Sequence, residues 1–441
     1  MTVSLSQAGK IVHHGWKSAW AWDKNHFHAP ARNFSSACRR ERSPIMKLST
    51  LKLCLPVVTV TAQQNAAQFI IPPFLDDLKY PVSAIGTLIS LAPIFALCAR
   101  VPSGIAYRRE RARWLLIAAI ATMALCNFLY SFAVRPLEFA VIHALNGFAY
   151  GAATTIYLAF YVDALPPDED RHHAMGYYAG CLAIGYSTGG FLAGYIADRL
   201  GYAATFNFSA FLALACVGLL FSLKAPASAA SRTGLRRETT PQTFFGSLKH
   251  LLNPKLAGIV VVALFVNLMH QMGNVFLPLY GLAVGITLTK VGVIKGLYAM
   301  CNAITRPLSG MAVKRFTQKN LAVVTLPLQA LFLTLVPLFH SFGPVLTLFV
   351  ISGFMRAVAI VSNTIGMVED VDETKVSRGV ASGLFNAAGD VGNIVGPSLG
   401  GLIATITGVE KLFFFGPVMV VAMFFVSLWS CKFIGRARVA S

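Results

Sequence analysis

Charged residues are scarce in this sequence. Only 12% of its 441 residues are Asp, Glu, Lys or Arg, whereas 56% are hydrophobic. A soluble globular protein carries roughly a quarter charged residues, and a chain this apolar has too few polar groups to cover a surface in water. The shortage excludes an ordinary soluble protein and indicates that lipid covers the molecule instead.

Paired cysteines and enzyme motifs are also lacking. The eight cysteines show no CxxC spacing and lie mostly inside apolar runs, which argues for packing and against a disulfide framework or a zinc site. No Walker lysine loop and no HExxH motif occurs, so the sequence gives no basis for nucleotide hydrolysis or zinc-dependent hydrolysis. We therefore expect no enzyme, no catalytic residues, no metal site and no cofactor.

Acidic residues are outnumbered by basic ones, 18 against 37, and the formal net charge is +19. The basic residues lie mainly in short loops between apolar segments, which the positive-inside rule of membrane insertion explains better than nucleic-acid binding does. This bias predicts a multi-pass protein of the cell membrane with both termini in the cytoplasm. An organelle membrane is the alternative location, and we expect no nucleic-acid partner.

Residues 1–45 lack the apolar core of a secretory signal peptide. They are rich in Trp, His, Lys and Arg, and their acidic residues are Asp23 and Glu41. Three interpretations of this tail stay open: an organelle transit segment, a disordered cytoplasmic segment, or an extension upstream of a true start at Met46.

Apolar stretches of about 20 residues, each long enough to cross a bilayer, recur after Leu51. The expected spans are 53–75, 82–106, 114–134, 137–161, 173–196, 202–223, 257–280, 287–311, 320–340, 345–367, 379–405 and 411–433. The expected domains are a six-helix bundle at 46–223, a basic cytoplasmic linker at 224–255, a second six-helix bundle at 256–434 and a tail at 435–441.

Motifs recur between the two halves at a nearly constant offset. Arg100-Val-Pro-Ser-Gly104 ends the second span, and Arg306-Pro-Leu-Ser-Gly310 ends the eighth, 206 positions later. The residues that recur 207 positions apart are Asp163 and Asp370, Arg171 and Arg378, and the glycine pairs 176/383, 185/392, 189/396 and 194/401. Chance would not keep one offset across three regions, so a duplicated six-helix unit is predicted.

From about residue 46 to 435 these motifs resemble the major facilitator superfamily. Gly104 and the basic cluster Arg108 to Arg113 resemble its signature between the second and third helices, and Gly396 to Gly401 resembles its glycine-proline signature. The family's acidic residue after that glycine is replaced by Tyr107 or Arg108. The fifth span also lacks the proline of the drug/proton antiporters, and their fourth-span arginine is replaced by His143.

The resemblance implies an all-α polytopic membrane protein whose twelve transmembrane helices form two pseudo-symmetric six-helix bundles around a central cavity. It is closest to drug or sugar efflux members of the family. Glycines in the fifth and eleventh spans are expected either to let the bundles rock or to pack statically. The candidate gating residues are Arg100, Gly104, Asp163, Arg171, Arg306, Gly310, Asp370 and Arg378. We expect Arg100 and Arg306 to reach lipid headgroups or loop carboxylates such as Asp163 and Asp370.

Polar side chains near the middle of four spans mark the expected solute site, since such groups are expensive against lipid. The candidate solute-binding residues are Gln63, Gln64, Asn65, Gln68, Asn267, His270, Gln271, Asn274, Arg356 and Asn363. Those of the seventh span are spaced three, four and seven apart, so they form one stripe. His270 could titrate or simply bond a neighbouring helix, and Lys295 could join the cavity or snorkel outward.

Asp390 and Arg356 each lie about 16 Å inside their spans by the helical rise. They therefore reach the same level, and we expect them to interact with each other or to face water, because an isolated charge there is costly. Asp390 is the candidate proton-coupling residue, and a permanent structural ion pair is the alternative.

The leading hypothesis is a secondary active transporter that moves a small solute by alternating access, with protons as the candidate coupling ion. A facilitated-diffusion uniporter without ion coupling is the first alternative, and a non-transporting membrane sensor with the same fold is the second. The expected partners are the solute and the lipid bilayer, and the protein is expected to be a monomer.

Overall fold

The computed structural model describes residues 48–165, 171–223, 254–313, 318–374 and 378–439. The predicted tail at 1–45 and nearly all of the predicted linker at 224–255 lie outside these ranges. All of the described residues belong to the second of the two units into which the chain divides, Met1–Lys47 and Leu48–Ser441.

Helices account for almost all of the described chain. The first half contains α2 (Leu48–Asp77), α3 (Val82–Ala106), α4 (Arg109–Tyr130), α5 (Pro136–Ala164) and α6 (Arg171–Ser222). The second half contains α8 (Pro254–Ala283), α9 (Leu288–Val313), α10 (Gln318–Thr334), the 3-10 turn η3 (Val336–Leu338), α11 (Phe342–Thr374), α12 (Arg378–Thr407) and α13 (Val409–Val439).

The long helix α6 is two helices in one. Gly201 has φ 84° and ψ 178°, a backbone conformation that ends one helix and starts another. Only glycine adopts it without strain. The break falls between the fifth and sixth predicted spans. Each predicted span coincides with a helix over most of its length, but the third ends early at Tyr130 and the ninth at Thr334, where a 3-10 turn follows.

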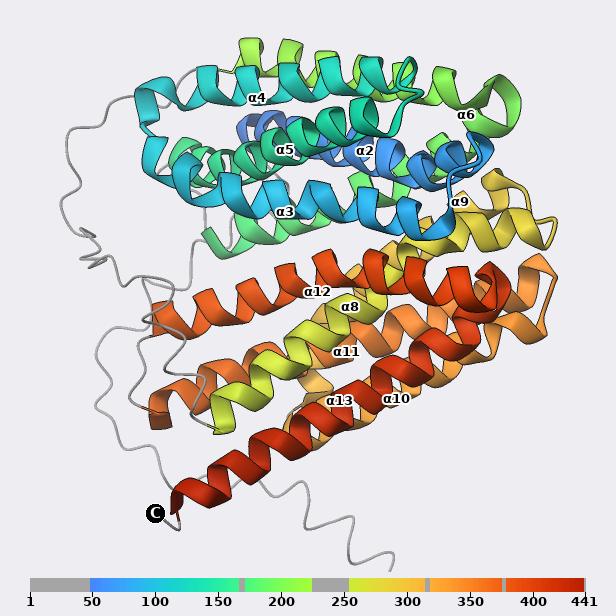
Figure 1. The fold of residues 1–441 in the computed structure, drawn as a ribbon. Helices are drawn as coiled ribbons and strands as arrows, with labels where there is room; N and C mark the ends of the chain where they lie inside the picture. The colour runs from blue at the N-terminus through green and yellow to red at the C-terminus, as the bar shows by residue number, and fades with distance from the viewer. Residues whose placement is uncertain (1–47, 166–170, 224–253, 314–317, 375–377, 440–441) are drawn as a thin grey trace, which may run out of the picture. The chain divides into compact units, whose positions relative to one another are not determined.

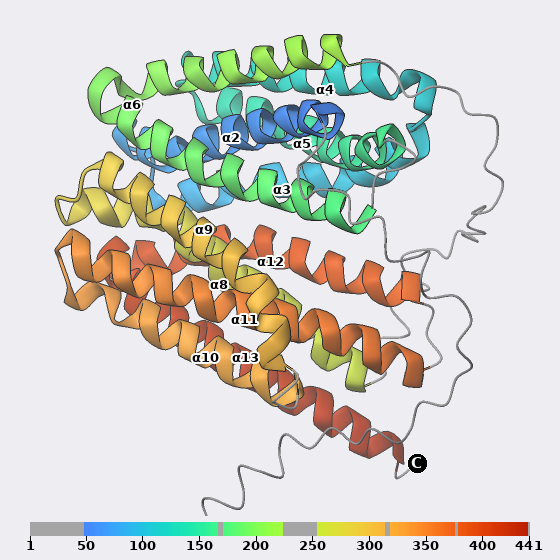
Figure 2. The ribbon, with the colours of Figure 1, turned by 180° about the vertical axis from the view of Figure 1, so that it is seen from behind.

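The helices form two bundles, α2–α6 and α8–α13 (Figures 1 and 2). Within the first bundle α2 packs mainly on α6, and α3 on α5; within the second, α8 packs mainly on α12, and α10 on α11. The bundles meet where α3 crosses α12 and α6 crosses α9, with a smaller contact between α2 and α8.

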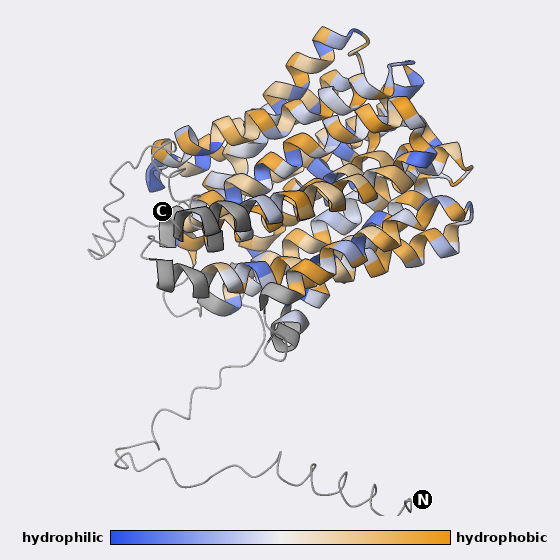
Figure 3. Ribbon diagram, turned by 60° about the horizontal axis from the view of Figure 1, so that its bottom comes forward, coloured by the Kyte–Doolittle hydropathy of each residue, from blue (hydrophilic) through white to orange (hydrophobic). Residues whose placement is uncertain are grey.

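Six described helices are long and apolar enough to cross a membrane by length and composition: Val82–Ala106, Arg109–Tyr130, His173–Ser222, Leu256–Ala283, Phe342–Met367 and Val409–Ser430. Apolar residues run along the helices in Figure 3. The helices α2, α9 and α12 are not among the six, and they carry the amides of the first span, Lys295 and Asp390. Helices α5 and α10 are also not among the six.

Each bundle has two ends, which we call the linker end and the far end. The linker end carries the α3–α4 junction at 107–108 and the start of α8, and the far end carries the junctions at 78–81 and 284–287 (Figure 1). At the far end the bundles touch through glycines. Gly86 of α3 faces the backbone of Pro397 and Gly401 on α12, and Gly292 of α9 faces the backbone of Gly190 on α6.

These two crossings are copies of each other. Gly86 and Gly292 lie 206 positions apart, and Gly194 and Gly401, which also lie at the crossings, are 207 apart. The other predicted glycines behave differently: Gly185 and Gly189 pack on α2, and their counterparts Gly392 and Gly396 pack on α8, each inside its own bundle. Only part of the predicted glycine seam therefore joins the two bundles.

Replacement of Gly86 by Leu should disrupt the α3–α12 crossing, because a Cβ there meets the backbone of α12. Overpacking of this kind costs about 1–3 kcal/mol. We expect a lower thermal unfolding temperature of the purified protein for Gly86→Leu. The control is Gly218→Leu on α6, where a Cβ meets open space; if both variants melted alike, the crossing would not be a tight contact.

Candidate functional site

The predicted polar stripe of α8 is present as one face of that helix. Asn267, His270, Gln271 and Asn274 are all half-buried, whereas the residues between them, 268, 269, 272 and 273, are buried. The stripe therefore faces a less crowded region than the rest of the helix does, as its spacing predicted.

His270 makes the contact with a neighbouring helix that the sequence favoured. Its Nδ1 lies 2.9 Å from the hydroxyl of Tyr298 on α9, and the two rings stack with centroids 5.4 Å apart. Lys295, one turn before Tyr298, is buried rather than snorkelling outward: its Nζ donates to the Asn274 carbonyl oxygen at 3.2 Å. The same Nζ lies 4.9 Å from the centre of the Phe69 ring on α2, so Lys295 stands where the bundles meet.

A pocket lies against these side chains, between α8, α9, α10 and α11. Its polar lining comes from His270, Asn274, Lys295, Tyr298, Gln329 and Ser352, and its apolar lining includes Met269, Leu277, Leu333 and Phe349. Gln329 on α10 and Ser352 on α11 are missing from the predicted site. Each is a single polar residue in an apolar run, and only the packing shows that both reach the α8 stripe.

The other polar candidates of the second bundle bond within it. Arg356 donates from Nη2 to Oδ1 of Asn267 at 3.3 Å. Asn363 donates to the Ile259 carbonyl oxygen at 3.0 Å and is buried, so its visible role is to join α11 to α8.

The four amide side chains of α2 do not all point the same way. Asn65 and Gln68 are half-buried, and Asn65 Nδ2 donates to the Tyr186 carbonyl oxygen of α6 at 2.5 Å. Gln63 and Gln64 instead point into the first bundle and are buried there.

A buried chain of amides inside the first bundle holds Gln63 and Gln64. Asn127 of α4 donates to Gln63 Oε1 at 2.6 Å, and Gln64 donates to Asn146 of α5 at 3.4 Å. Asn146 in turn donates to Asn127 Oδ1 at 3.4 Å, which closes the chain. Asn127 and Asn146 escaped the sequence prediction because each stands alone in its span.

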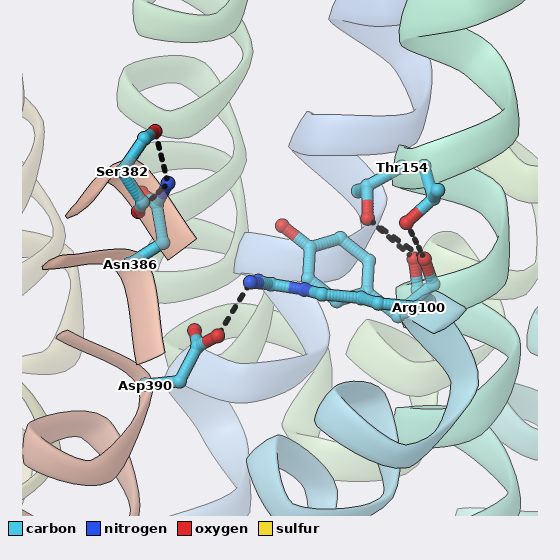
Figure 4. Close-up of polar contacts among 8 residues, drawn as sticks. Arg100, Thr154, Ser382, Asn386 and Asp390 are labelled. Carbon is cyan, nitrogen blue, oxygen red and sulfur yellow. Dashed lines mark hydrogen bonds and ion pairs between the residues drawn. The ribbon is translucent and has the colours of Figure 1, made fainter. Parts of the chain in front are cut away.

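Asp390 forms an ion pair with a partner other than the predicted one. Its Oδ2 lies 2.5 Å from Nη1 of Arg100 on α3, so the pair joins the two bundles (Figure 4). The expected pair of Asp390 with Arg356 is wrong, since Arg356 donates to Asn267. Helical depth placed Asp390 correctly near the middle of its helix, but depth alone does not show which way a side chain points.

Asp163 likewise does not bind Arg100. Its carboxylate accepts two hydrogen bonds from Arg109, at 2.9 and 2.7 Å, and one from the Tyr107 hydroxyl at 2.7 Å. Burial and the neighbouring Asp163 raise the pKa of Tyr107, which keeps its hydroxyl a donor. Tyr107, which stands where the resembling family has an acid, thus binds an acid from α5 instead.

The structure describes fewer contacts for the remaining gating candidates. Arg306 donates to Asn302 on its own helix at 3.2 Å, and Gly104 is exposed with open space around it. Only the backbone is described at Arg171, Gly310, Asp370 and Arg378.

Polar contacts reinforce both crossings at the far end. Ser90 of α3 donates to the Ile394 carbonyl oxygen of α12 at 2.7 Å. Asp198 of α6 accepts from the backbone N–H groups of Leu288 and Thr289, at 3.1 and 2.6 Å, and so caps the first turn of α9. Sequence reasoning missed Asp198, because it lies within α6, 90 positions before Leu288, and only the fold brings it to the start of α9.

Two stretches match the G-x-S-x-G pattern of hydrolases, Gly185-Tyr-Ser-Thr-Gly189 and Gly396-Pro-Ser-Leu-Gly400. The second lies within helix α12 and the first at the α6–α9 crossing. A nucleophilic serine in that pattern stands on a strained turn between a strand and a helix. Here both stretches are helical, and Ser187 donates to the Gly296 carbonyl oxygen of α9 at 3.1 Å. Ser187 is therefore a packing residue.

Asp163 should stabilise the linker end of the first bundle, because it satisfies donors from Tyr107 and Arg109. Asp163→Asn should lower the free energy of unfolding by about 1–2 kcal/mol. This value is at the lower end for hydrogen bonds to charged groups, because Arg109 is half exposed. We expect a measurably lower thermal unfolding temperature. In the matched control Glu138→Gln, the pair with Arg135 is exposed, so almost no change should follow. Equal effects would show that Asp163 has no special structural role.

Comparison with known proteins shows which family the sequence matches. The model of the Major Facilitator Superfamily matches residues 53–375 and 283–438. An uncharacterized MFS-type transporter of Methanocaldococcus jannaschii is 19% identical over 344 residues, which cover 78% of this chain and 88% of that protein. Multidrug resistance protein 2 of Bacillus subtilis is 23% identical over 374 residues, which cover 82% of this chain and 90% of that protein.

Solved transporters share the architecture. The crystal structure of the nucleoside transporter NupG aligns with a TM-score of 0.72 at 15% identity, over 88% of this chain and 99% of that chain. A bacterial homolog of the human lysosomal transporter Spinster, in an inward-facing and occupied conformation, aligns with a TM-score of 0.70 at 13% identity, over 90% of this chain and 98% of that chain. These likenesses confirm the predicted all-helical fold.

Proposed function

We propose that this chain, which belongs to the Major Facilitator Superfamily, moves a small solute across a membrane by alternating access and couples that movement to protons. The family and its relatives are transporters, so the chain is a multi-pass membrane transporter and not an enzyme. The alternation, the proton and the cytoplasmic placement of the linker end are the proposed part.

The observation that carries the proposal is the unequal contact between the bundles at their two ends. At the far end glycine backbones touch at two crossings, and Ser90 and Asp198 add hydrogen bonds. Toward the linker end, the polar contact between the described parts of the bundles is that of Arg100 with Asp390. Such an arrangement suits a state that is closed at the far end and open at the linker end.

Arg100 and Asp390 can act as a latch for this state. Figure 4 shows the Arg100 guanidinium extending across the space between α3 and α12 toward the Asp390 carboxylate. Side-chain exposure is 43% for Arg100 and 14% for Asp390, so the acid is held mainly by this one cation. A proton on Asp390 would remove the attraction between the bundles, and intramembrane acids commonly serve as proton relays.

The comparisons support this proposal without naming a solute. The similar proteins include a multidrug resistance protein and a nucleoside transporter, and the Spinster homolog was solved in an inward-facing conformation. Facilitated diffusion without ion coupling remains the competing hypothesis, and it differs in leaving Asp390 a purely structural partner of Arg100.

Asp390→Asn should release the latch and abolish its dependence on pH. In a variant with its native cysteines replaced, spin labels at Ile105→Cys on α3 and Gly383→Cys on α12 report the separation of the bundles at the linker end; both positions are exposed. We expect the label-to-label distance distribution to change between pH 8 and pH 5 in the otherwise native protein. In Asp390→Asn the distribution should stay in its low-pH form at both values.

The control for this measurement is Glu410→Gln, which removes an exposed acid at the start of α13. It should retain the pH response. Distances that ignore pH in the native protein, with solute transport intact, would favour the uniporter over proton coupling. A single fixed distance under every condition, without transport, would contradict alternating access itself.

A further inference from the structure

Three basic side chains gather around His270 and Tyr298 in the second bundle. Lys295 of α9 lines the same pocket as His270 and Tyr298. Arg356 of α11 bonds Asn267, which precedes His270 by about one turn. Arg306 lies on α9 about two turns after Tyr298. Gly353 on α11 lets the Tyr298 ring pack against its backbone, which brings α9 and α11 together at this point. The cluster therefore lies where α8, α9 and α11 converge.

This cluster lacks an acidic counterpart. Among the described side chains, the ion pairs are Arg100 with Asp390, Arg109 with Asp163, and Arg135 with Glu138. None of them includes Lys295, Arg306 or Arg356. Arg306 is exposed, but Lys295 is buried and Arg356 is half-buried. Buried positive groups are expensive unless water or a negative partner reaches them.

The adjoining pocket contains polar atoms that no protein group satisfies. Gln329 Oε1 and Ser352 Oγ, in residues that are 1% and 0% exposed, have no hydrogen-bond partner in the described structure. Buried polar atoms are nearly always paired, so two unpaired oxygens in the lining of one pocket point to a bound molecule.

We propose that the pocket binds a small organic anion that also carries a hydroxyl or N–H donor, and that this anion is the transported solute. Lys295, which lines the pocket, holds the negative group, since its amine donates one hydrogen bond and has two more to give. The Ser352 hydroxyl can donate to the same molecule, and Gln329 Oε1 accepts from its donor. Met269, Leu333 and Phe349 contact its apolar part. This assignment rests on the proposed transport function and adds the chemical class of the solute.

The competing explanation is that Lys295 is structural. Its amine bonds the Asn274 carbonyl oxygen and faces the Phe69 ring, so it could tie α9 to α8 and α2. The two explanations differ in the solute-free protein. A structural lysine stabilises the empty protein, whereas a ligand-binding lysine with unused donors does not.

The first measurement is therefore the thermal unfolding temperature of the purified full chain without added solute. Lys295→Met should leave this temperature unchanged or raise it. The control is Lys290→Met, an exposed lysine five positions earlier on the same helix, and it should have no effect. A drop for Lys295→Met alone would overturn the proposal, because the amine would then be structural whatever ligand is tested.

The second measurement uses matched anionic and neutral probes: AMP and adenosine, glucose 6-phosphate and glucose, 4-hydroxybenzoate and 4-hydroxybenzamide. At least one anion should raise the unfolding temperature by about 2 °C or more, as expected for a ligand well above its Kd. Its neutral partner should not, Lys295→Met should lose the shift, and Lys295→Arg should retain part of it.

Stabilisation by the neutral members alone would overturn the anion assignment, and stabilisation by phosphatidylglycerol but by no soluble anion would assign the charge to lipid headgroups instead. Neither result would contradict the transport proposal, which the spin-label distances test separately. Conversely, fixed distances together with anion binding at Lys295 would preserve the site and reject its role in transport.

Discussion

Close backbone contact at two glycine crossings is the constraint on which the rest of the molecule depends. Apolar helices gain little from meeting each other in lipid, so bundles associate through small residues that let backbones approach. Gly86 against α12 and Gly292 against α6 provide that approach at the far end. Because both crossings lie there, the bundles are free to differ in separation at the linker end, where a side-chain pair replaces backbone contact.

The cost of burying polar groups explains how each bundle is built inside. The first bundle meets this cost largely with neutral amides, which bond one another from Gln63 through Asn127 to Asn146, although Gln64 Oε1 is left without a partner among the described residues. The second bundle leaves the side-chain oxygens of Gln329 and Ser352 without partners in the part of the chain that the structure describes. Unpaired polar atoms therefore occur in both bundles, and those of Gln329 and Ser352 are distinguished by lying in the lining of a pocket.

Much of this architecture could be predicted from the sequence, because hydropathy and a fixed repeat are properties of the chain itself. The spans, the halves and the α8 stripe follow from period and length. Contacts between distant helices do not: depth placed Asp390 and Arg356 at one level, yet Asp390 turns to Arg100. Adjacent helical residues point about 100° apart, so Gln63, Gln64 and Asn65 could not all face one cavity. Lone polar residues such as Gln329 gave no periodic signal at all.

The two halves of the repeat share their crossing glycines but differ in several of their charged residues. Glycines at the crossings are duplicated at offsets of 206 or 207, and so is Arg306, whose counterpart is Arg100. Lys295, Arg356 and Asp390 are not duplicated. The positions that correspond to Lys295, Arg356 and Asp390 in the first half are Ile89, Ala149 and Ala183. A charge needed only for folding within a bundle would be expected in both copies, since both copies pack alike. Charges confined to one copy instead break the symmetry at the cavity, which is what a solute with a charged end requires of its site.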